Sequence, residues 1–220
     1  MNEILFIFHT ILISCFALGA LVLGSEALIA FICLQTILAN LFVIKPIMLC
    51  GWTATGADAF TIGAVFGFHL LQEFYGRNLT KKVIWLSFGM LFFYLIMSQI
   101  HLLYIPHSCD LTQQHFYALL SLMPRIAIAS LVSYLISQQF DCWLYEKLRL
   151  AFKGNYLPAR NYVCAATSQL LDTVLFSFLG LLGIINNIGE VMIISYGIKL
   201  TALALTTPFL LVVRRLKNRY

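Results

Sequence analysis

The chain has 220 residues, of which 61% are hydrophobic and only 10% are charged. An ordinary soluble domain carries about 25% charged residues, so this composition excludes a soluble fold with a polar surface. The formal net charge of +5 does not indicate a nucleic-acid partner, because the basic residues form short clusters between apolar runs, where membrane topology explains them. The apolar runs continue for about twenty residues, which is the length of a membrane-spanning helix and not of an alternating barrel strand.

These runs predict an all-α fold, a polytopic transmembrane bundle of about seven helices that forms one domain over residues 1–220. The least distinct boundary is the turn at Gly24 to Glu26 between the first two helices. Six spans therefore remain an alternative, with a six-helix core preceded by an N-terminal helix. The predicted helices cover residues 4–23, 27–49, 57–75, 82–104, 117–143, 161–184 and 189–213.

Two of these helices carry small residues at every fourth position. Small residues on one stripe let neighbouring helices approach closely, so we interpret both stripes as packing surfaces. The stripes are Ala59, Gly63 and Gly67 in helix 57–75, and Ala129, Ser133 and Ser137 in helix 117–143.

The distribution of basic residues predicts the orientation of the bundle. Eleven of the 14 Lys and Arg residues fall in three places that lie on one side of a seven-helix bundle, and the loops on the other side contain none. The positive-inside rule places that side, and with it the C-terminus, in the cytoplasm. The three clusters are Arg77, Lys81 and Lys82; Lys147, Arg149, Lys153 and Arg160; and Arg214, Arg215, Lys217 and Arg219.

A second group of charges lies at membrane depth, where each costs about 2.5–3.5 kcal/mol and usually faces a cavity or a partner. Asp172 is near the middle of helix 161–184, and Lys199 is near the middle of the next helix, which should pack against it. An ion pair that only fixes helix packing is one interpretation. The nearby polar and aromatic groups are more than an ion pair alone requires, and this favours a substrate site. The site would be formed by Asp172, Lys199, Arg125, Gln169, Thr173, Phe176 and Tyr196, with Ser168 beside them.

Other charges near the helix ends have two interpretations each. Glu73 and Asp141 can serve coupling or gating, or they can pair with the interfacial Arg77 and Lys147. Lys45 can serve the same role or extend to the membrane surface. Asp58 near the start of helix 57–75 is interpreted as a helix cap.

Motifs for catalysis and cofactor binding are absent from the sequence. It contains no GxxxxGK[ST] phosphate loop, no HExxH and no GxSxG, so we expect neither an enzyme nor a cofactor. His101, His107, His115 and Asp110 are spaced too irregularly to indicate a metal site.

Four segments together resemble the queuosine-precursor transporters, also called the vitamin uptake transporter family. The resemblance extends over about residues 35–213 and leaves the first helix outside. Two positions depart from the family pattern: His69 stands where relatives often carry an acidic residue, and Gln169 where they commonly carry Asn. The segments are LQEFYGRNLTKK (71–82), PRIAIASLVSYLISQQFDCWLYEKLR (124–149), SQLLDTVLFSFLG (168–180) and YGIKLTALALTTPF (196–209).

The resemblance implies a multi-pass protein of the bacterial inner membrane that imports queuine or 7-deazaguanine bases such as preQ0 and preQ1 for tRNA modification. Its partners would be a nucleobase-like substrate and the lipid bilayer. A homo-oligomer and a separate energising partner stay open. The alternatives are a substrate-binding subunit of a partner-dependent uptake system and a membrane enzyme or assembly factor.

Overall fold

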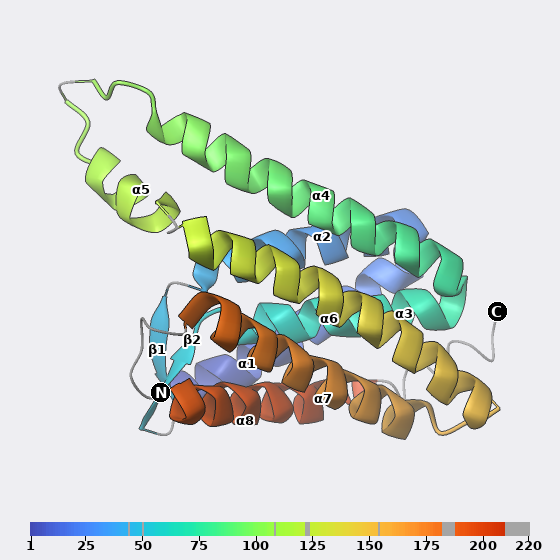
Figure 1. Ribbon diagram of the computed structural model, residues 1–220. Coiled ribbons are helices and arrows are strands. Elements are labelled where there is room, and N and C mark those ends of the chain that lie inside the picture. The colour runs from blue at the N-terminus through green and yellow to red at the C-terminus, as the bar shows by residue number, and fades with distance from the viewer. Residues whose placement is uncertain are drawn as a thin grey trace.

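A computed structural model describes residues 1–43, 45–49, 51–107, 109–121, 124–153, 155–181 and 188–209. Within these ranges the chain forms a helical bundle with one short hairpin (Figure 1). Seven helices have 18 residues or more, which agrees with the predicted number. The elements are α1 (Asn2–Leu23), α2 (Ser25–Phe42), β1 (Pro46–Leu49), β2 (Trp52–Thr55), α3 (Asp58–Tyr75), α4 (Arg77–Leu102), α5 (Gln113–Leu120), α6 (Pro124–Ala151), α7 (Leu157–Phe176), the π-helical segment η1 (Ser177–Leu181) and α8 (Ile188–Thr206).

Helix α3 is the centre of the bundle. Fourteen of its 18 residues are buried, and it contacts α1, α2, α4, α6, α7 and α8. The small stripe on α3 confirms the predicted close packing: a Cβ on Gly63 would overlap Ile13 of α1, and one on Gly67 would lie 2.8 Å from Cγ1 of Ile32 of α2. Because α3 is enclosed, its Asp58, His69, Gln72 and Glu73 are all kept away from lipid.

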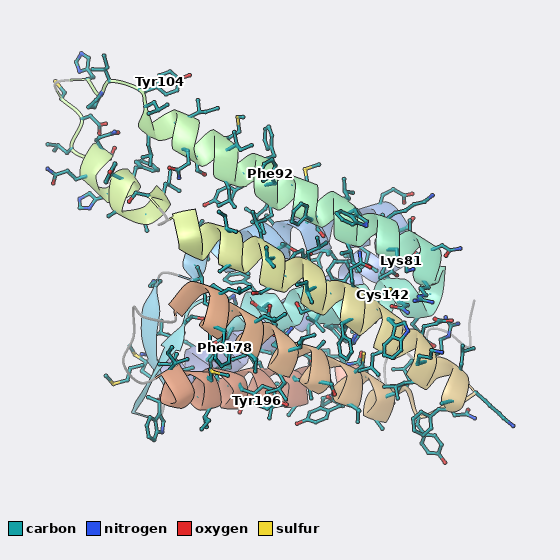
Figure 2. The ribbon with its side chains drawn as sticks, in the orientation of Figure 1. Lys81, Phe92, Tyr104, Cys142, Phe178 and Tyr196 are labelled. Carbon is teal, nitrogen blue, oxygen red and sulfur yellow. The ribbon has the colours of Figure 1, made fainter. Side chains whose placement is uncertain are left out.

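The outer surface of the bundle is apolar. Large side chains of α1 and α4 are among the exposed ones, including Phe8, Phe16, Trp85 and Phe92, the last of which is labelled in Figure 2. In a soluble protein this surface would be unfavourable, but lipid chains solvate it. Among the described residues, four helices are long and apolar enough to cross a membrane (α1, α2, α4 and residues 157–180), and α8 is a shorter apolar helix.

The predicted helix 27–49 is wrong beyond Phe42. Pro46–Leu49 and Trp52–Thr55 form an antiparallel strand pair in which Leu49 pairs with Trp52. Pro46 explains the break, since a proline disfavours helical backbone in the residue before it and has no N–H to donate. Gly51, directly before β2, has a φ of +82°, a conformation that suits glycine.

Two further predictions about helix boundaries need correction. The predicted helix 117–143 is two helices, because α5 ends at Leu120 and a new helix begins with Pro124, a residue that favours the first turn of a helix. The first two predicted helices, by contrast, are confirmed as separate: Gly24, with a φ of +118°, divides α1 from α2. Residues 182–184 and 210–213 of the last two predicted helices lie outside the described residues.

The bundle has two chemically different ends. The α3–α4 and α6–α7 junctions lie together at one end, where Figure 2 labels Lys81. The hairpin and the N-terminus lie at the opposite end, and Asn2 donates a hydrogen bond to the carbonyl of Met48. Two of the three basic clusters therefore share one end. Most residues of these two clusters lie in helix ends and not in the connections, since α4 begins at Arg77 and α6 ends at Ala151. Arg160 differs from the others in its burial: it is in the first turn of α7 and is 1% exposed.

Close packing of α3 on α2 predicts the effect of adding one methyl group at Gly67. Gly67→Ala should lower the free energy of unfolding by about 1–3 kcal/mol, because the new Cβ overlaps Ile32. Gly89→Ala is the matched control, since nothing lies within 4 Å of a Cβ at that position of α4. Thermal unfolding of both variants in the same detergent measures the difference, and equal stability would contradict this description of the α2–α3 contact.

Candidate functional site

A polar cavity lies between α2, α3, α6, α7 and α8, toward the hairpin end of the bundle. Its volume is about 120 Å³, and residues from β2 also border it. The cavity exists where polar faces of five helices meet: Asn40 of α2 donates to Ser130 of α6 at 3.0 Å, and Tyr134 of α6 lies 3.4 Å from Thr36 of α2. Such a chamber inside an apolar bundle can hold a polar molecule.

Asp172 and Lys199 form an ion pair in the wall of this cavity. The Lys199 Nζ donates to Oδ2 of Asp172 at 2.9 Å and to Oγ1 of Thr173 at 3.2 Å. The other oxygen of Asp172 accepts a hydrogen bond from Ser137 at 3.3 Å. The side chain of Lys199 is 9% exposed and that of Asp172 is 19% exposed, so both reach the cavity from the protein interior. The predicted contact between the last two long helices is therefore present.

Several polar atoms around the cavity have no protein partner among the described residues. They are Oδ2 of Asp58, Oγ of Ser133 and Oε1 of both Gln138 and Gln169. Leaving a buried polar group without a hydrogen bond costs about 1–3 kcal/mol, so native structures rarely keep several together without a purpose. A polar ligand or water in the cavity can complete these four hydrogen bonds. Other buried polar atoms without a partner among the described residues, such as Nε and Nη1 of Arg160, do not border the cavity.

The predicted site residues are only partly brought together. Asp172, Lys199, Gln169 and Phe176 line the cavity, and Thr173 contacts Lys199. Tyr196 instead donates its hydroxyl to the carbonyl of Ala166 at 3.2 Å and does not line the cavity. The side chain of Arg125, in the first turn of α6, lies outside the part of the chain that the structure describes.

Sequence reasoning missed several residues of the cavity. Asp58 is not a helix cap: it is the first residue of α3, it makes no capping hydrogen bond and it lines the cavity. Ser133 and Ser137 were interpreted as packing residues, yet both face this site. The signal was the spacing of the polar residues in helix α6, because Ser130, Ser133 and Ser137 fall on one helical face.

A second polar cluster, nearer the basic end, surrounds Glu73. Its carboxylate binds Nη2 of Arg160 at 2.5 Å and accepts a hydrogen bond from the Tyr145 hydroxyl at 3.1 Å. Nε of Arg149 lies 4.0 Å away. Glu73 is therefore paired with the buried Arg160, a partner that neither sequence interpretation of Glu73 included. A carboxylate held by these partners matches a structural ion pair more closely than a mobile gate.

Asp141 also has partners that the sequence did not indicate. Its Oδ2 lies 2.6 Å from Nε2 of His69, and its Oδ1 accepts a hydrogen bond from Ser168 at 2.6 Å. The Cys164 thiol lies 3.3 Å from both Oδ1 and the backbone carbonyl of Asp141. The described partners of Asp141 do not include Lys147, which one of the two sequence interpretations suggested, and the missed residue is His69, which is 1% exposed.

Two further sequence interpretations concern the surface. Lys45 is exposed in the link between α2 and β1, where it borders a hollow with His9 and Phe60. His101, His107 and His115 are not buried, in contrast to His69. Among the described residues, the group with the composition of a metal site is His69, Asp141 and Cys164, whose ligand atoms lie within 4.8 Å of one another.

Comparison with known proteins places these features in a family. The family described as "Putative vitamin uptake transporter" matches residues 56–213, which include α3 to α8. A protein of Bacillus subtilis (strain 168) named "Probable queuosine precursor transporter" is 34% identical over 179 residues, covering 81% of this chain and 77% of the relative. No solved structure matches the chain. With this match and this relative, the chain belongs to the vitamin uptake transporter family and is a multi-pass membrane protein with a role in transport.

Proposed function

We propose that this protein imports queuosine precursors, either queuine or 7-deazaguanine bases such as preQ0 and preQ1, for salvage into tRNA modification. The observation that carries the proposal is the cavity, where one polar atom on each of four side chains has no partner in the part of the chain that the structure describes: Asp58, Ser133, Gln138 and Gln169. The name of the Bacillus subtilis relative supports the same substrate class. A bacterial inner-membrane location and a cytoplasmic C-terminus follow as expectations from the family and from the basic end of the bundle.

The chemistry of a deazaguanine base complements this cavity. One edge of the base presents a ring N–H and an exocyclic amine, and a carboxylate can accept both hydrogen bonds. Asp172 could be this acceptor, and Asp58 offers a second carboxylate whose Oδ2 has no protein partner among the described residues. The base carbonyl would accept from Lys199 or from a glutamine amide, and the flat ring would pack on Phe176.

The remaining predicted residues would act from the edge of the site. Thr173 positions the Lys199 ammonium through their hydrogen bond. Tyr196 joins α8 to the backbone of α7 and so would hold the two cavity walls together. Arg125 stays a predicted substrate-binding residue. Since a site built from hydrogen bonds discriminates strongly against molecules that lack the matching groups, we expect guanine analogues without the exocyclic amine to be excluded.

Import can be tested in bacteria that cannot make queuosine precursors but retain the later enzymes. Queuine, preQ1 and preQ0 are supplied singly, and queuosine in tRNA is measured. We expect one or more of them to restore queuosine, and Asp172→Asn to lower the rate at least about tenfold, because hydrogen bonds to a buried charge contribute about 1.5–3 kcal/mol each. Asp110→Asn, in the exposed α4–α5 connection, is the control. Restoration by none, with the protein present in the membrane, would refute the proposal.

A double variant separates a substrate site from a purely structural ion pair. Asp172→Asn alone leaves Lys199 as an unpaired buried charge, whereas Asp172→Asn with Lys199→Gln removes both charges together. If the pair contacts the substrate, uptake stays at least about tenfold low in the double variant even when its thermal stability returns to the wild-type value. Recovery of uptake along with stability would assign the pair to helix packing.

A further inference from the structure

The His69–Asp141 pair is buried, polar and separate from the walls of the cavity. The two side chains come from α3 and α6 and are 1% and 2% exposed. Nε2 of His69 lies 2.6 Å from Oδ2 of Asp141, and the opposite nitrogen, Nδ1, lies 2.6 Å from the side-chain oxygen of Asn161 on α7. Both ring nitrogens therefore have a partner with the protein surrounding them.

Asn161 allows this histidine to keep its hydrogen bonds in two protonation states. When the imidazole is charged, Nδ1–H donates to Oδ1 of Asn161. When it is neutral with its proton on Nε2, a rotated Asn161 amide would place its NH₂ group to donate to the bare Nδ1. The Asn161 Nδ2 atom has no partner among the described residues in the first arrangement, so the rotated state loses no other bond. A purely structural histidine needs only one of these states.

Among the charged groups around the pair, His69 is the one that contacts Asp141. Glu73, on the next turn of α3, and Arg160 of α7 neutralise each other. On α6, Tyr145 stacks on His69 with ring centroids 4.6 Å apart, and on α7 the Cys164 thiol contacts Asp141. The cations of the other neighbouring helices are directed elsewhere: Lys199 of α8 binds Asp172, and Arg77 of α4 interacts with Cys142. With neutral His69 the pair carries one negative charge, and with protonated His69 it carries no net charge.

Helices α6 and α7 carry residues of both the pair and the cavity wall. On α7, Ser168 binds Asp141, and the next residue, Gln169, faces the cavity. On α6, Gln138 faces the cavity one turn before Asp141. A change of charge at the pair therefore acts directly on the helices that form two cavity walls. Intramembrane carboxylate and histidine groups of this kind serve as proton relays in transporters.

We propose that His69 and Asp141 form the proton-binding site that couples substrate import to proton entry. His69 takes up a proton on Nδ1 while the site faces outward and releases it from the same nitrogen when the site faces inward, and no covalent bond between heavy atoms changes. This inference rests on the proposed import function. It gives the protein an energy source that needs no separate partner.

The experiment uses purified full-length protein in lipid vesicles, with radiolabelled queuine, preQ1 and preQ0 as probes. Accumulation is measured with the vesicle interior more alkaline than the medium. Exchange is measured without a gradient, with unlabelled probe inside. A pH-sensitive dye inside the vesicles reports proton entry when substrate is added. The variants are His69→Gln and Asp141→Asn, which keep hydrogen-bonding groups, and the control is His101→Gln, at the exposed end of α4.

Wild-type protein and His101→Gln should accumulate substrate and acidify the vesicles. His69→Gln and Asp141→Asn should lose gradient-driven accumulation at least about tenfold while exchange stays within about twofold, since only the coupling is removed. Parallel loss of both activities would assign the pair to folding or binding, and unchanged accumulation would also overturn the inference.

Measurements on the wild-type protein distinguish a failure of this inference from a failure of the proposed import function. Exchange without gradient-driven accumulation keeps the import function and overturns the proton site. Transport in cells but not in vesicles means that an energising partner is required, and it overturns the proton site as well. Absence of transport in both systems refutes the import function and the inference that rests on it.

Discussion

A helix that carries Asp58, His69, Gln72 and Glu73 can lie inside a membrane only if other helices enclose it, and this constraint shapes the whole molecule. Helix α3 occupies the centre, and α1, α2, α4, α6, α7 and α8 contact it. Glycines at positions 63 and 67 bring α1 and α2 close enough to seal one side. The outer helices can then be almost entirely apolar, because polar chemistry is confined to the faces that meet α3.

Two polar regions result, and they differ in how their hydrogen bonds are completed. Near the basic end, Glu73 of α3 accepts hydrogen bonds from Arg160 of α7 and Tyr145 of α6, and these bonds connect the three helices. Near the hairpin end, Asp172 and Lys199 border a cavity with several unpaired polar atoms. Both regions hold buried polar atoms without a partner among the described residues, including two nitrogens of Arg160, but the cavity adjoins the second region. This cavity is the reason for proposing the substrate site in the second region.

The fold could be predicted from the sequence because lipid imposes strict rules on segment length and polarity. The seven long helices correspond to the seven apolar runs, and Asp172 and Lys199 were correctly expected to meet through adjacent helices. The hairpin at residues 46–55 and the break before Pro124 were missed, since apolar strands and loops at the membrane boundary resemble short extensions of a spanning helix. Local signals, Pro46 and Pro124, were present but weaker than hydropathy.

The sequence by itself determined that this chain is a membrane bundle, which residues carry its costly charges and which family it resembles. The tertiary structure decided how those charges pair. Arg160 was counted with the loop residues but is the partner of Glu73, and His69, separated from Asp141 by 72 positions, became its partner. Hydropathy and periodicity describe each helix separately, whereas a pair depends on which helices adjoin and on how each is rotated about its axis. Only the packed bundle fixes those relations.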